Sequence, residues 1–135
     1  MAFVSFSAAA KIVDEILSIS DGILAVSIID ERRSGEVLAS KSKESFDKEF
    51  GVYREGPKYG GTLAIAMLSI ANEVREIAGE AKAIMTTYDR CKMMLLRMKS
   101  HGIMVGLVLQ SSVNAEDYNN DIGNKIEGLL AGDIR

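Results

Sequence analysis

His101 and Cys91 have the side chains best suited to catalysis in this sequence. His101 lies in a tight turn before an apolar segment, and no nucleophile or orienting partner is recognisable around it. Cys91 stands between Arg90 and Lys92, whose positive charges favour a thiolate. A reactive thiol also needs a defined environment, which the sequence does not indicate. We therefore expect an exposed turn histidine and an ordinary strand or turn cysteine.

Metal binding and phosphate binding have little support in the sequence. No His, Cys and carboxylate set occurs at the spacing of metal ligands. Gly56, Gly60 and Gly61 precede a helix, where backbone amides can cradle a phosphate, but no Walker-type lysine follows them. We expect these glycines to form a loop leading into the helix. The sequence predicts no catalytic residues, no metal and no cofactor, and hence no enzyme.

The composition indicates one folded domain spanning residues 1–135, with 47% hydrophobic and 26% charged residues. A net charge of −3 disfavours a nucleic-acid-binding protein. One cysteine cannot form an internal disulfide, and the apolar runs are too short to span a membrane. No secretory signal is recognisable. These features predict a cytoplasmic protein.

Hydrophobic periodicity predicts five strands and three main helices. The predicted strands are Ile23–Asp30, Glu36–Ser40, Lys82–Tyr88, Lys92–Met98 and Ile103–Gln110. The helices are a first one capped by Ser7, a long middle one over Thr62–Glu80 and a last one capped by Asn114. Since Ile23–Asp30 is apolar on both faces of its pleat, we expect it to be a central strand.

The middle helix has more apolar surface than one contact can cover. One narrow stripe is expected to face the sheet, and it consists of Leu63, Met67, Ile70, Val74 and Ile77. Apolar and small residues off that stripe suit a second helix at close approach. They predict a homodimer interface made of Ala64, Ile65, Leu68, Ala71 and Ala78.

The connection over residues 41–61 combines charged residues, glycines and half of the aromatic residues. We expect an ordered connection with a helical turn around Glu44–Phe50, anchored by Phe46 and Phe50. Tyr53 and Tyr59 are the candidates for binding a partner, because a phenolic hydroxyl tolerates water while the ring supplies contact area.

The α-β-β-α-β-β-β-α order, with Gly22–Asp30 followed by a hairpin, resembles the roadblock/LC7 family within the profilin-like and longin-like superfold. The resemblance covers the chain from Ala8 to Leu130, and the 41–61 connection is longer than is usual there. It implies an α+β fold: a five-stranded antiparallel sheet, with the first and last helices on one face and the middle helix on the other. It also implies dimerisation through the middle helix and the neighbouring edge strand.

The function implied by this resemblance is a non-enzymatic, homodimeric scaffold that regulates a small Ras-like GTPase or binds another protein. A profilin-like module that senses a small molecule, in a pocket near the aromatic residues at positions 46–59, is the alternative. An uncharacterised enzyme is a second alternative.

Overall fold

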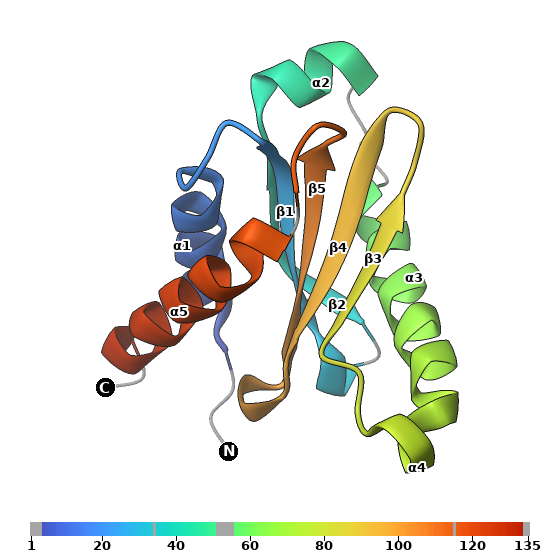
Figure 1. Ribbon diagram of the computed structural model, residues 1–135. Coiled ribbons are helices and arrows are strands. Elements are labelled where there is room, and N and C mark those ends of the chain that lie inside the picture. The colour runs from blue at the N-terminus through green and yellow to red at the C-terminus, as the bar shows by residue number, and fades with distance from the viewer. Residues whose placement is uncertain (1–3, 34, 51–55, 115, 134–135) are drawn as a thin grey trace.

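The protein is built on a five-stranded antiparallel sheet with helices on both faces (Figure 1). The computed structural model describes residues 4–33, 35–50, 56–114 and 116–133. In chain order the elements are α1 (Phe6–Leu17), β1 (Ile23–Asp30), the 3-10 turn η1 (Glu31–Arg33), β2 (Glu36–Ser42), α2 (Glu44–Phe50), α3 (Gly56–Ala71), the 3-10 turn η2 (Asn72–Val74), α4 (Arg75–Ala78), β3 (Ala83–Thr87), β4 (Cys91–Met98), the 3-10 turn η3 (Lys99–His101), β5 (Ile103–Gln110) and α5 (Glu116–Asp133). The predicted strands and main helices all appear, in the predicted order.

The strand order across the sheet is β2-β1-β5-β4-β3. β1 lies inside the sheet, between β2 and β5, and it contributes buried side chains to both faces. Val26 belongs to the core on one face and Ile29 to the core on the other. This explains why β1 is apolar at nearly every position, and it confirms the predicted central strand.

The larger core lies between the sheet and the first and last helices. Ile12 and Ile16 of α1 and Ile122 and Ile126 of α5 are fully buried there. A smaller core lies on the opposite face, under α3. The predicted placement of the helices, two on one face and the middle one on the other, is therefore confirmed.

Side-chain caps fix the starts of α1 and α5. Ser5, and not the predicted Ser7, caps α1, because its hydroxyl accepts a hydrogen bond from the backbone N–H of Ala8 at 3.0 Å. The predicted cap of α5 is confirmed, since Asn114 Oδ1 accepts a bond of 3.2 Å from the N–H of Glu116.

The middle helix differs most from its predicted form. It begins at Gly56 instead of near Thr62, so the glycines expected in a loop lie in its first turns. Pro57 is compatible with this start, because a proline in the first turn lacks only an N–H that has no helical partner. The helix is then interrupted by η2 before it continues as α4. No helix among the described residues has the length and apolar composition of a membrane span.

Candidate interaction surface

The inner face of α3 packs on the sheet through a small and a large apolar residue. Ala64 and Leu68 are 4% and 7% exposed, in one cluster with Leu95 of β4 and Met104 of β5. Ile65 packs at the edge of this cluster. The short side chain of Ala64 lets the helix approach the strands closely, so that Leu68 reaches the core.

The outer face of the middle helix carries large apolar side chains in solvent. Ile70 is 73% exposed, Val74 53% and Ile77 91%. The prediction that these three residues face the sheet is therefore wrong. A small residue fits against a sheet as well as against a second helix, and here Ala64 faces the sheet together with Leu68, so the bulkier stripe faces outward. We call Ile70, Val74 and Ile77 the outer stripe.

The five residues predicted for a dimer interface are thus divided between the two sides. Ala64 and Leu68 are buried against the sheet of their own chain, Ile65 and Ala71 are half-buried at the flanks, and Ala78 is exposed on α4. The residues that sequence reasoning missed are those of the outer stripe. The apolar spacing of these residues is visible in the sequence, but it does not show whether they face the sheet or the solvent.

A free strand edge lies on the same side of the molecule as the middle helix. β3 is the last strand of the sheet, and among the described residues it pairs with β4 alone. Met93 of β4, 37% exposed, lies two residues before the buried Leu95 and so points to the same face, the one that carries α3. The outer stripe and the edge of β3 together form the candidate interaction surface.

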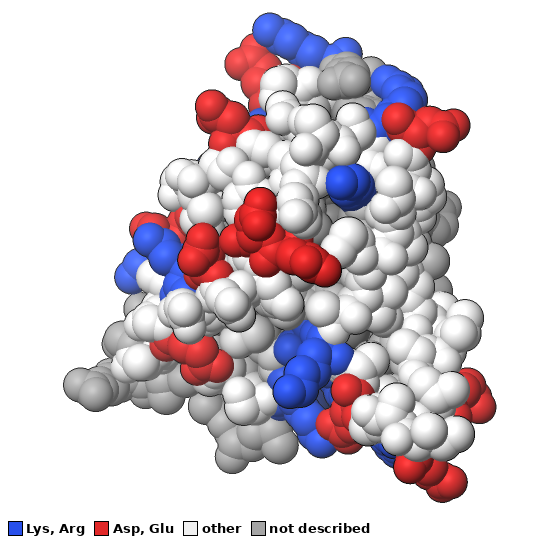
Figure 2. All heavy atoms as spheres, in the orientation of Figure 1, with Lys and Arg blue, Asp and Glu red and all other residues white. Residues whose placement is uncertain are grey.

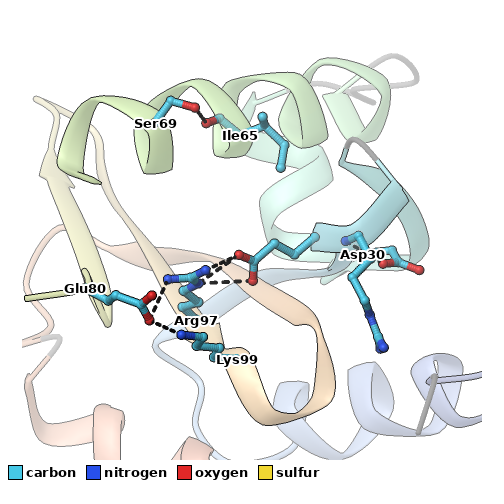
Figure 3. Close-up of polar contacts among 8 residues, drawn as sticks. Asp30, Ile65, Ser69, Glu80, Arg97 and Lys99 are labelled. Atoms are coloured by element: carbon cyan, nitrogen blue, oxygen red, sulfur yellow. Dashed lines mark hydrogen bonds and ion pairs between the residues drawn. The ribbon is translucent and has the colours of Figure 1, made fainter. Parts of the chain in front are cut away.

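A polar network ties the end of the middle helix to the sheet (Figure 3). Arg97 of β4 donates to both carboxylate oxygens of Glu31, at 2.9 and 3.1 Å through Nε, and lies 3.5 Å from Glu80. Lys99 contacts the same Glu80 carboxylate at 2.5 Å. The hydrogen bond from Lys99 lowers the pKa of Glu80, and the bond to Glu31 raises the pKa of Arg97. Glu80 follows α4, so the network fixes where the helix leaves the sheet face.

Removing the central cation of this network should destabilise the fold. Arg97→Met leaves the half-buried Glu31 carboxylate without its partner, and we expect a loss of about 1–3 kcal/mol in the free energy of unfolding. Lys99→Met is the matched control, because Lys99 is 66% exposed and a solvent-exposed ion pair adds little to stability. Urea unfolding of both variants measures the difference. Equal losses would show that Arg97 has no special structural role.

The predicted catalytic candidates take part in structural contacts. His101 is not the exposed turn residue that was expected: its side chain is 15% exposed, and Nε2 lies 3.0 Å from a carboxylate oxygen of Glu127 on α5. Cys91 is buried at the start of β4. Lys92 donates a 2.6 Å bond to the backbone carbonyl of Val113. These residues do not converge on one site.

Ligand sites are sparse in the part of the chain that the structure describes. No group of three or more His, Cys, Asp or Glu residues there could hold a metal ion. Two hollows among the described residues are lined by α3, α5, the sheet and the segment before β3, and Phe46 lines neither of them. Tyr53 lies outside the described residues, and the side chains of Phe50 and Tyr59 are likewise not described. The pocket expected near these aromatic residues therefore stays a prediction.

Comparisons with known proteins identify the fold. No protein-family model matches the sequence, and no curated protein matches it. Among solved structures, a roadblock/LC7 domain from Streptomyces avermitilis superposes with a TM-score of 0.71 at 8% identity, over 93% of this chain and 98% of the other. The gliding protein MglB from Thermus thermophilus gives 0.69 at 16% identity, over 97% and 91%. A structure described as MglB with tetrameric arrangement gives 0.72 at 16% identity, also over 97% and 91%. At such low identity the likeness is one of fold, and this chain has the fold of the roadblock/LC7 domain.

Proposed function

We propose that this protein is a non-enzymatic interaction module that forms a homodimer through its middle helix and the edge of β3. The observation that carries the proposal is the outer stripe. Three branched apolar side chains in one row along a helix are rarely left in water unless another surface covers them.

The outer stripe lies at the centre of the proposed interface, with Ala71 and Ala78 at its flank, while Ile65 packs against the chain's own core on the other side of α3. Ala64 and Leu68 support it from beneath as part of the chain's own core. The unpaired edge of β3 continues the interface, because a second β3 can supply the missing backbone hydrogen bonds. A two-fold axis brings equivalent patches together, so one patch is sufficient for both chains.

The energetics favour such an interface. Burying an exposed valine or isoleucine side chain contributes about 1.5–3 kcal/mol, and a symmetric dimer buries the outer stripe twice. The total, at most roughly 9–18 kcal/mol for six side chains, is comparable to the roughly 4–15 kcal/mol that association costs in lost translational and rotational freedom. Backbone hydrogen bonds between the two β3 strands add to this favourable free energy and make the dimer stable. The tetrameric arrangement described for one MglB supports assembly through this fold.

The dimer in turn serves as a cytoplasmic scaffold, with a small Ras-like GTPase as the proposed partner. This rests on the roadblock/LC7 fold and on the resemblance in element order. Tyr53 and Tyr59, in the connection before and at the start of the middle helix, are the proposed contacts to that partner.

Binding to small GTPases from the host cell tests this assignment. Each GTPase is loaded with GDP or with a non-hydrolysable GTP analogue, and its affinity for the protein is measured by calorimetry. We expect one GTPase to bind about tenfold more tightly in one nucleotide state, which corresponds to about 1.4 kcal/mol. If no GTPase binds more tightly in one nucleotide state than in the other, the GTPase assignment is refuted. The proposal of a homodimer is not affected by that result.

The tyrosine contacts are tested with the same assay. Tyr53→Ala and Tyr59→Ala should weaken binding by about tenfold or more, as expected for aromatic contact residues. Phe6→Ala is the control, because Phe6 is an exposed aromatic residue at the start of α1, on the other face of the sheet. If Phe6→Ala weakens binding as much as the tyrosine variants do, recognition lies elsewhere.

A further inference from the structure

The sheet face under α1 and α5 is incompletely covered. On this face β3 presents Ala83, Met85 and Thr87, and all three are exposed. The residues that face α3 alternate with them and are half-buried. Figure 1 shows the reason: α1 and α5 lie over the other strands, and β3 is the strand farthest from them. A helix on a sheet covers roughly 10 Å, or about two strands, so two helices leave the last of five strands bare.

A groove runs along this bare strand, between β3 and the first half of α5. It has a volume of about 180 Å³ and is lined by Ala83, Met85, Met94, Glu116 and Asn119. Its floor is apolar, and Met85 is 43% exposed within it. The volume suits one or two large side chains rather than a drug-sized molecule, which needs roughly 300 Å³ or more.

A glycine of α5 lies next to the residues that line the groove. Gly123 follows Asn119 by one helical turn, so both lie on the same side of α5. A Cβ atom built on Gly123 meets no atom within 4 Å. Position 123 therefore has open space around it, and a bulky side chain there can extend over the neighbouring groove without displacing a residue.

The upper end of the groove is acidic. Glu116 and Asp117 are exposed in the first turn of α5, and among the described residues neither carboxylate has a basic partner. The basic residue on this face of β4, Lys92, is held by the carbonyl of Val113. Figure 2 shows acidic side chains in the middle of the view, beside a broad surface over β4 and β3 that is white apart from one basic side chain. A ligand complementary to this groove is apolar with a positive charge at one end.

We propose that this groove binds an amphipathic helix of a partner protein, which inserts an apolar side chain between β3 and α5 and places a lysine or arginine against Glu116. A helix fits better than a strand, because the groove lies on a sheet face, where α1 and α5 already pack as helices. The thioethers of Met85 and Met94 adapt to different apolar side chains. All groove residues belong to one chain, so the site does not depend on the proposed dimer.

A designed peptide tests the groove directly. The probe is a synthetic helix of about five turns with a leucine stripe flanked by lysines, and the control peptide has glutamates in place of the lysines. Binding is measured by fluorescence anisotropy. We expect the lysine peptide to bind with a dissociation constant in the micromolar range, and the glutamate peptide to bind about tenfold more weakly or worse.

Two tryptophan variants locate the binding. Gly123→Trp places a large ring beside the groove and should weaken binding of the lysine peptide by about tenfold or more, whereas Gly128→Trp should leave the affinity within about twofold of that of the wild type. Gly128 is the matched control, because it lies on the same helix and a Cβ there also meets no atom within 4 Å. Met85→Lys is a further variant at an exposed position. It should weaken binding of the lysine peptide, because the new lysine repels the lysines of the peptide.

The outcomes are decisive in either direction. No binding of the lysine peptide, equal binding of both peptides, or equal effects of the two tryptophan variants would overturn the proposal. The titration is repeated with Ile70→Lys, a variant expected to be monomeric. Retained binding there shows that the groove acts independently of the interface on the middle helix.

Discussion

Ile70→Lys should convert the protein from a dimer into a monomer that is still folded. Ile70 is 73% exposed within one chain, so a lysine at this position costs the isolated fold little. In the proposed dimer the same lysine would be buried without a partner, at a cost of several kcal/mol. We expect the dissociation constant of the dimer to rise by at least about a hundredfold, which corresponds to about 2.7 kcal/mol. Light scattering after size-exclusion chromatography measures the change.

Ser69→Lys provides the matched control for this experiment. It adds the same charge to the same helix, about 100° around the axis from Ile70 and away from the outer stripe. In Figure 3 Ser69 and Ile65 lie on α3, where the Ser69 hydroxyl donates to the carbonyl of Ile65 at 2.9 Å. Dimerisation of Ser69→Lys should remain close to that of the wild type. If both lysines dissociate the dimer equally, net charge is the cause and the outer stripe is not the interface.

Leu68→Ala should weaken the fold itself. Leu68 is 7% exposed in the core between α3 and the sheet, so truncation removes apolar contacts and leaves a cavity. We expect a loss of about 2–5 kcal/mol in the free energy of unfolding. Because dimerisation also adds to apparent stability, the comparison is made by urea unfolding in the monomeric Ile70→Lys background.

Ile77→Ala in the same background is the control for Leu68→Ala. Ile77 is 91% exposed, so its truncation should change the free energy of unfolding of the monomer by less than about 0.5 kcal/mol. The reverse result, with a stable Leu68 variant and an unstable Ile77 variant, would mean that the middle helix packs on the sheet through the outer stripe.

The strands were predictable from the sequence because each is specified by local residues. Ile23–Asp30 and Ile103–Gln110 have the predicted bounds, since both are long apolar runs bordered by glycine or charged residues. β3 and β4 differ from prediction by no more than one residue at either end. The order of these elements was also sufficient to indicate the roadblock/LC7 fold.

The rotation of the middle helix could not be predicted in the same way. Apolar residues surround much of α3, so periodicity alone allows either the side with Ala64 and Leu68 or the outer stripe to face the sheet. The choice depends on how closely the helix can approach β4 and β5, which is a property of tertiary packing. The start of α3 at Gly56 was missed for a related reason, since glycine lowers helix propensity by about 1 kcal/mol and tertiary contacts can offset this cost.

The groove beside β3 was beyond sequence reasoning, because its walls are far apart in the chain. Met85 and Glu116 come from β3 and α5, and only the fold brings them together. The side-chain pairs of the polar network are equally distant in sequence, as with Arg97 and Glu31. In each case the residue types were visible, and their proximity was not.

Sedimentation equilibrium of the wild-type protein over a wide concentration range tests the central claim most directly, namely that the outer stripe is covered by a second copy of the chain. We predict a mass of two chains at tens of micromolar, the range in which a specific homodimer of this kind should be fully associated. A mass of 14.6 kDa, that of one chain, at every concentration would contradict the proposed dimer.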